Sequence, residues 1–183
     1  MQSPRYALVA YVNDSLAGFV KQIRQELHPN LPHLAAHVTV LPPRTLYEGE
    51  AAAIAAVCDV CRHVDPFDLR LGEVETFIPV TPTVFIRVVH AYRLRALHDQ
   101  LIAKKPLAMK EEWPYLPHLT IVKMSTEAQA QEAYRLACHR WTEYDGSRCV
   151  QVKELTFVRE EENATWADVA ALPLSGVISP RIL

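Results

Sequence analysis

Two segments of the chain, residues 37–40 and 118–121, share one pattern in which a histidine and a threonine alternate with aliphatic residues. The second histidine follows the first by 81 residues, and Glu154 follows Glu73 by the same number within a matching apolar pattern. Such a repeat indicates a duplicated unit, and two long copies are too few for a solenoid. We therefore expect two similar lobes whose equivalent strands meet across a central groove.

Periodicity predicts the same order of elements in both copies: strand, helix, strand, helix, strand. Residues 6–12, 36–41 and 67–77 are short apolar or alternating runs next to turn-forming residues, as is typical of strands. Residues 15–28 and 49–64 space their apolar side chains as helices do. The second copy is expected to contain strands at 83–89, 116–122 and 149–158, helices at 94–102 and 126–142, and a further strand at 166–172.

A chain of 183 residues fits one compact domain or two small lobes that share an interface. We expect a single domain, 1–183, whose lobes cover about 1–80 and 83–172, with exchange of strands between the lobes possible.

The two motifs place their polar side chains on one face of each strand. Because side chains alternate along a strand, His37 shares a face with Thr39, and His118 shares one with Thr120. The aliphatic neighbours occupy the other face, which is suited to packing against helices. The alternative is that both histidines are core residues bonded to backbone groups, with the threonines present for their β-propensity.

A pair of histidines suits the cleavage of a phosphodiester. In-line displacement at phosphorus needs a base on the attacking oxygen and an acid on the departing oxygen, on opposite sides of the phosphorus. Histidine can serve in either role near neutral pH. Threonine hydroxyls can donate hydrogen bonds to the non-bridging oxygens, and no divalent metal is required.

The paired motifs, their separation and the Pro-His-Leu-Thr-Ile form of the second copy resemble the two-histidine (2H) phosphoesterase superfamily, especially its LigT-like 2′-5′ RNA ligase branch. The resemblance covers nearly the whole chain. It implies an α+β fold with two antiparallel sheets flanking a cleft and helices outside. It also implies catalytic roles for His37 and His118, phosphate binding by Thr39 and Thr120, and no cofactor.

The activity implied by this resemblance is opening of a 2′,3′-cyclic phosphate to a 2′-phosphate, on a small nucleotide or an RNA terminus. The alternatives are 2′-5′ ligation, opening of another cyclic phosphate such as one on ADP-ribose, and binding of RNA ends or nucleotides without turnover. The near symmetry of the two copies leaves open which histidine is the base.

Four further residues are candidates for substrate binding. Arg44 and Lys123 lie just beyond the two motifs and could attract a phosphate or be solvated surface charges. Many LigT-like members have an arginine near the position of Lys123, and lysine keeps the charge without the bidentate fork. Arg87 interrupts an apolar strand, and Tyr115 could stack a base or pack in the core.

Composition argues against several other classes of protein. A net charge of −2 is unlike a protein that coats nucleic acid. The chain has no glycine-rich phosphate loop, no apolar run of about 18 residues and too few cysteines for a disulfide scaffold. His33 and His37 have the spacing of a helical metal pair, but Pro29 and Pro32 disfavour a helix there, so no metal site is expected. We expect a cytoplasmic monomer.

Overall fold

The computed structural model describes residues 3–12, 15–27, 35–162 and 165–176. Within them, eight antiparallel strands form one sheet in the order β6-β3-β4-β5-β2-β1-β7-β8. The strands are β1 (Tyr6–Tyr11), β2 (His37–Arg44), β3 (Phe67–Thr76), β4 (Thr83–Val89), β5 (His118–Lys123), β6 (Cys149–Val152), β7 (Glu154–Glu160) and β8 (Trp166–Pro173). The helices are α1 (Ser15–Leu27), α2 (Glu50–Cys61), α3 (Tyr92–Ile102) and α4 (Glu127–Glu143), with a 3₁₀ turn at Lys105–Leu107.

The sheet consists of two four-stranded halves built on the same plan. From the centre outward, one half runs β5, β4, β3, β6 and the other β2, β1, β7, β8. Glu75 and Thr156 are 81 residues apart and occupy equivalent positions in the two halves. Glu75 lies opposite Phe85 in one half, and Thr156 lies opposite Val9 in the other. This arrangement confirms the expected α+β fold. The two expected sheets are continuous through β5 and β2, which pair at Val38 and Leu119.

The C-terminal part of each sequence repeat lies in the half that holds the other repeat's motif. Strand β3 pairs with β4, whereas β7 pairs with β1. The single strand expected at 149–158 is therefore wrong: the chain leaves β3 after β6 and joins β1 as β7, with a break at Lys153. The burial pattern reflects this change, because β6 alternates between exposed and buried residues while β7 is buried at four consecutive positions.

Strand β2 also differs from expectation at its C-terminal end. The sequence predicts its end at residue 41, but it continues through Pro42 and Pro43 to Arg44, which pairs with Tyr6. A proline is tolerated in a strand where its missing N–H is not needed by a neighbour. Strand β2 pairs with β5 at Val38, well before the prolines, so its β5 side is a free edge at Pro42 and Pro43. The register of β2 with β1 is irregular there, which accommodates the prolines.

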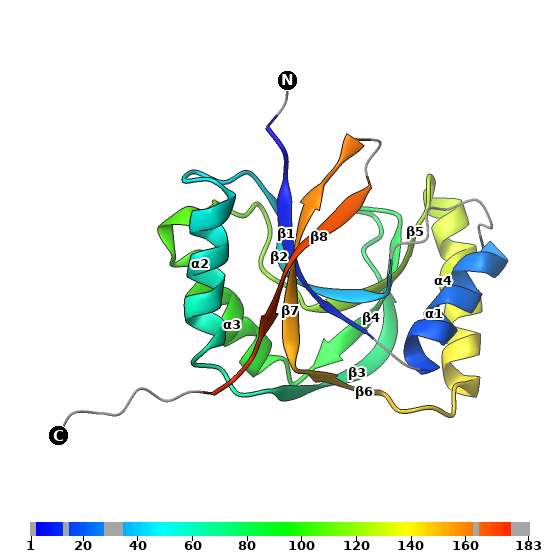
Figure 1. Ribbon diagram of the computed structural model, residues 1–183. Helices are drawn as coiled ribbons and strands as arrows, with labels where there is room; N and C mark the ends of the chain where they lie inside the picture. The colour runs from blue at the N-terminus through cyan, green and yellow to red at the C-terminus, as the bar shows by residue number, and fades with distance from the viewer. Residues whose placement is uncertain (1–2, 13–14, 28–34, 163–164, 177–183) are drawn as a thin grey trace.

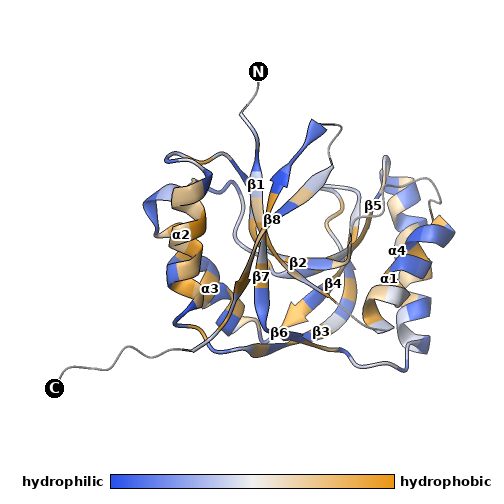
Figure 2. Cartoon of the chain, in the orientation of Figure 1, coloured by the Kyte–Doolittle hydropathy of each residue, from blue (hydrophilic) through white to orange (hydrophobic). Residues whose placement is uncertain are grey.

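Two pairs of helices cover the outer face of the sheet. Helices α1 and α4 pack on β3, β4 and β5, and helices α2 and α3 pack on the other half (Figure 1). Colouring by hydropathy shows apolar residues on the sides of the helices that face the strands (Figure 2). Thr126 caps the N-terminus of α4, with its side chain accepting a hydrogen bond from the Gln129 amide at 3.3 Å. The face of the sheet away from the helices is left for the two motifs.

Candidate functional site

The structure brings the four motif side chains together on this uncovered face. Val38 and Leu119 lie opposite each other with no exposed surface, so both point into the helix-covered core. In this antiparallel register His37 falls opposite Thr120, and Thr39 falls opposite His118. The histidines are diagonal neighbours, and such positions are roughly 7–8 Å apart. Two imidazoles at this separation can contact one phosphate between them.

Both histidines are held in the same way. The Nδ1 atom of His37 lies 2.8 Å from the Ala35 carbonyl, and that of His118 lies 2.7 Å from the Leu116 carbonyl. Because a carbonyl only accepts hydrogen bonds, each Nδ1 carries a proton and donates it. The Nε2 atom of each neutral ring is then a free base. The two rings thus offer equivalent proton-transfer atoms.

Burial lowers the pKa of both imidazoles below the ordinary value. Desolvation is the main cause, and the hydrogen bond from each Nδ1 opposes it. The nearby positive charges of Arg24 and of His118 lower the pKa of His37 further. This repulsion between the rings is consistent with their placement in one site, and it favours a state in which at most one of them is protonated.

The backbone of the first motif is anchored by side chains from the other repeat. Tyr115 donates its hydroxyl to the Thr39 carbonyl at 2.8 Å, and Nδ1 of His98 on α3 lies 2.8 Å from the Val40 carbonyl. The rings of Tyr115 and His98 stack with 3.9 Å between centroids. The two side chains therefore hold the backbone of the strand that presents His37.

An arginine performs the equivalent task at the second motif. Arg24 on α1 donates from Nη2 to the Thr120 carbonyl at 2.9 Å and from Nε to the Ile121 carbonyl at 2.7 Å. These carbonyls correspond to those of Thr39 and Val40 under the 81-residue shift. Each motif strand is thus fixed by a helix that follows the first strand of the opposite repeat.

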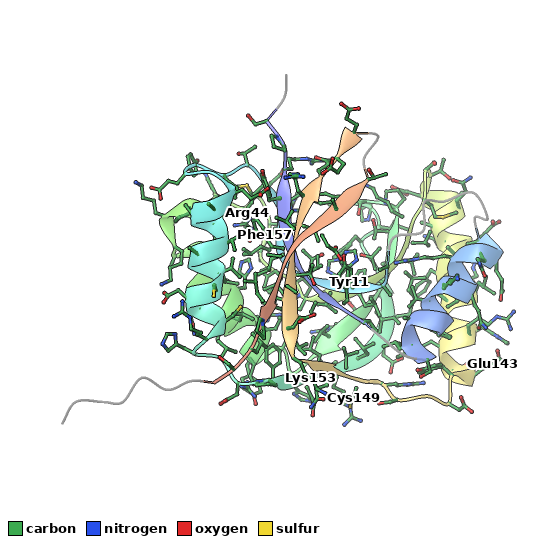
Figure 3. The ribbon with its side chains drawn as sticks, in the orientation of Figure 1. Tyr11, Arg44, Glu143, Cys149, Lys153 and Phe157 are labelled. Atoms are coloured by element: carbon green, nitrogen blue, oxygen red, sulfur yellow. The ribbon has the colours of Figure 1, made fainter. Side chains whose placement is uncertain are left out.

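Arg44 does not lie with the histidines. Its side chain is 1% exposed and forms an ion pair with Glu111 at 2.7 Å. It also donates to the Leu107 carbonyl at 2.7 Å, while Glu111 lies 3.2 Å from Nε2 of His98. Figure 3 shows Arg44 towards α2 and Tyr11 in the middle of the molecule. The expectation that Arg44 attracts substrate is therefore not supported, since its charge is used in the core.

The other three candidate residues have different surroundings. Tyr115 uses its hydroxyl and one ring face inside the protein, which disfavours base stacking. Arg87 lies opposite His118 on β4, is exposed, and pairs with Glu75 at 3.3 Å. Lys123 is exposed at the end of β5, opposite Thr83. Of these three, Arg87 is the one that the strand register places beside a motif histidine.

Aromatic side chains that sequence reasoning missed surround the histidines. Phe77 and Phe85 contact the His118 ring edge-on, with centroids 5.0 and 5.1 Å away. Tyr11 lies opposite His37 and donates its hydroxyl to Asp168 at 2.6 Å. The run 6–12 is apolar throughout, so it gave no sign that Tyr11 faces the groove; the pairing of β1 with β2 was needed.

A cavity of about 500 Å³ opens beside the first motif. His37, Thr39 and Pro43 line it from β2, and Asp168 and Trp166 line it from β8. Within the described parts of the chain, no three His, Cys, Asp or Glu side chains gather as a metal site would require. His33, considered above with His37, lies outside the described residues. No helix in the described ranges is long and apolar enough to cross a membrane.

Comparison with known proteins gives one consistent result. The model of the 2′-5′ RNA ligase superfamily matches residues 12–164. A protein of Halalkalibacterium halodurans, named as a candidate phosphoesterase, is 30% identical over 117 residues, which are 63% of this chain and 68% of the relative. A protein of Bacillus pumilus with a similar name is 23% identical over 163 residues, which cover 88% and 92% of the two chains.

Solved structures share the fold at low sequence identity. The protein TT0787 of Thermus thermophilus has a TM-score of 0.68 at 15% identity, covering 95% of this chain and all of the other. LigT of Escherichia coli in complex with NADP⁺ has a TM-score of 0.65 at 15% identity, covering 96% and 99%. These proteins therefore share the fold of this chain.

Proposed function

The chain belongs to the 2′-5′ RNA ligase superfamily, and from that premise we propose that it opens 2′,3′-cyclic phosphates of nucleotides or RNA ends to 2′-phosphates. The observation that carries the proposal is the matched pair of rings. His37 and His118 both donate from Nδ1 to a backbone carbonyl and both present Nε2 to one face of the sheet. A binding site alone would not require two equivalent proton-transfer atoms.

The reaction uses one neutral and one protonated imidazole. The neutral Nε2 takes a proton from water as the water oxygen forms its bond to phosphorus. The bond from phosphorus to O3′ breaks, and the other Nε2 gives its proton to that oxygen. The hydroxyls of Thr39 and Thr120 donate to the non-bridging oxygens, where negative charge concentrates. The number of protons on the two histidines does not change, because one imidazole gains a proton from water while the other gives one to O3′.

A structural relative has been solved with bound nucleotides. LigT of Escherichia coli has been solved with 3′-AMP as well as with NADP⁺. Since the likeness shows the fold alone, the substrate class for this chain rests on its own groove. The exposed Arg87 beside His118 adds a positive charge that suits a phosphate.

Incubation with 2′,3′-cyclic AMP and with an oligonucleotide ending in a 2′,3′-cyclic phosphate tests the proposal. We expect a 2′-phosphate product, and we expect EDTA to leave the rate unchanged. Production of a 3′-phosphate, or a rate that requires added metal, contradicts the mechanism. Micromolar binding of both compounds without product indicates a binding protein, and joining to an added 5′-hydroxyl oligonucleotide indicates a ligase.

The pH dependence follows from the lowered pKa values of both histidines. Turnover needs the base neutral and the acid protonated, so the rate rises with pH through one pKa and falls through the other. Because burial lowers both, kcat/KM, which reports the free enzyme, should peak on the acid side of about pH 6.5. The anionic substrate raises both pKa values, so kcat should peak at higher pH. Steady-state rates between about pH 4 and 9 measure both curves, and a kcat/KM maximum in alkaline buffer would contradict the assignment.

Tyr115→Phe tests the anchor behind the first motif. The change removes the hydroxyl that holds the Thr39 carbonyl, and we expect kcat to fall about tenfold because a small misplacement of a reacting group is costly. KM should change little, since Tyr115 has no proposed contact with substrate. Tyr47→Phe is the matched control because Tyr47 is 76% exposed. Equal kcat values for both variants would remove the positioning role of Tyr115.

A further inference from the structure

A small apolar cluster lies on the groove face, away from the main core. Ala7, Val9 and Val158 are each at most 5% exposed, with Tyr11 and Trp166 packed against them. No helix covers this face in the described residues, so strands β1, β7 and β8 present these side chains to the groove. Polar side chains are usual on a sheet face that is turned to solvent. Here the partly exposed rings of Tyr11 and Trp166 pack against the three buried residues and give the groove an apolar wall.

The cluster is continuous with the first motif. On β1, Val9 lies opposite Thr39 and Tyr11 lies opposite His37. The cavity of about 500 Å³ is lined by the whole cluster together with His37 and Thr39. This volume lies within the range of small-molecule sites. A group held at His37 would therefore extend directly over the apolar cluster.

In the other half of the sheet, larger side chains occupy the corresponding positions beside the histidine. Val9 lies opposite Thr39 at the first motif. The equivalent residue at the second motif is Phe85, which lies opposite Thr120. The Phe85 ring stacks on Phe77 with 4.1 Å between centroids, and both rings contact His118. Large rings thus pack around the second motif where small side chains leave space beside the first. The pseudo-symmetric groove is consequently asymmetric in what it can hold.

The rim of the hollow has the polarity that a nucleoside requires. Asp168 accepts the Tyr11 hydroxyl through Oδ1 at 2.6 Å and is otherwise exposed, so Oδ2 is available as an acceptor. Bases and ribose carry N–H and O–H donors at their edges, whereas their faces stack on aromatic and aliphatic side chains. An apolar surface with an acceptor at its edge matches this combination.

We propose that the hollow formed by β1, β7 and β8 is a nucleoside subsite, in which the base stacks on Trp166 and the cyclic phosphate reaches His37 and Thr39. The subsite rests on the proposed function, because it places the base of the same substrate. It makes the enzyme selective for nucleotides over cyclic phosphates that lack a base, and it places the base on the His37 side of the groove.

The test compares 2′,3′-cyclic AMP with ribose 2′,3′-cyclic phosphate, which has no base. Wild type should use the nucleotide with kcat/KM at least tenfold higher. Trp166→Ala should lower kcat/KM for the nucleotide about tenfold, mainly through KM, and leave the base-free compound unchanged. Trp113→Ala is the matched control, since Trp113 is 62% exposed and does not line the cavity. Unchanged turnover of the base-free compound also shows that the variant is folded.

Each outcome bears on one of the two proposals. Equal use of both compounds by wild type, or an equal loss with both in Trp166→Ala, overturns the subsite and leaves the proposed function standing. Turnover by wild type of neither compound, nor of the oligonucleotide that ends in a 2′,3′-cyclic phosphate, overturns the proposed function. The subsite is then tested by titration calorimetry with 2′-AMP and ribose 2-phosphate, where equal affinities overturn it. If Trp166→Ala does not fold, Trp166→Leu keeps an apolar side chain without the stacking ring and should show the same selective loss.

Discussion

Replacing either His37 or His118 by alanine is expected to lower turnover of a 2′,3′-cyclic nucleotide about 10³-fold. Each imidazole performs one of the two proton transfers, and general acid–base catalysis contributes roughly 10²–10⁴-fold. The double variant should be little worse than either single variant, because groups that act on one transition state are not additive. Folding should persist, since both rings face the groove rather than the core.

His139→Ala is the matched control for these two variants. His139 lies on α4 with 67% of its side chain exposed, far from the groove face. Either single variant that keeps more than a tenth of wild-type kcat would argue that its histidine is not part of the reaction. Thermal unfolding of all three variants separates loss of chemistry from loss of structure.

The pH dependence of the residual rates of His37→Ala and His118→Ala also shows which histidine is the acid and which is the base. Loss of the base removes the limb of the pH profile that rises with pH, and loss of the acid removes the limb that falls. The near symmetry of Nδ1 bonding leaves this assignment open. If the base of the substrate lies on the His37 side, as proposed above, the departing O3′ lies there too, and His37→Ala should lose the falling limb.

Much of the site could be predicted because its main features are local. Alternation along a strand is a property of the backbone, so His37 and Thr39 share a face in whatever sheet contains them. The 81-residue shift then relates this face to that of His118 without any knowledge of contacts. The observed pairing of Val38 with Leu119 is the step that joins the two faces, and a symmetric duplication requires equivalent strands to meet.

The errors arose where the outcome depends on distant partners. Arg44 follows the first motif closely in sequence, but Glu111 and the Leu107 carbonyl hold it in the core. Residues 149–158 are one run of strand-forming residues, and the break at Lys153 follows from a change of neighbour from β3 to β1. Nothing in the local pattern encodes such a change.

A second large effect is expected for Glu111→Ala, this time on stability. The Arg44 side chain is 1% exposed, so its charge cannot reach water when Glu111 is removed. Removing one partner of a buried ion pair costs about 3–5 kcal/mol, because the remaining charge is left uncompensated. Urea unfolding of the variant should show a loss of this size. Glu48→Ala is the control, because it breaks the exposed pair with Lys105 and should leave the midpoint unchanged.

The two ends of the buried pair should not be equivalent. Glu111 keeps 15% of its side-chain surface exposed, so its carboxylate can be hydrated when Arg44 is replaced by methionine. Arg44→Met should therefore cost less than Glu111→Ala, although it removes the same ion pair. Equal losses in the free energy of unfolding would mean that the stability comes from the ion pair itself. They would contradict the view that the unpaired, buried charge of Arg44 causes the loss. Glu111→Ala should in addition lower kcat, since Glu111 orients His98, and His98 holds the carbonyl of Val40 next to the first motif.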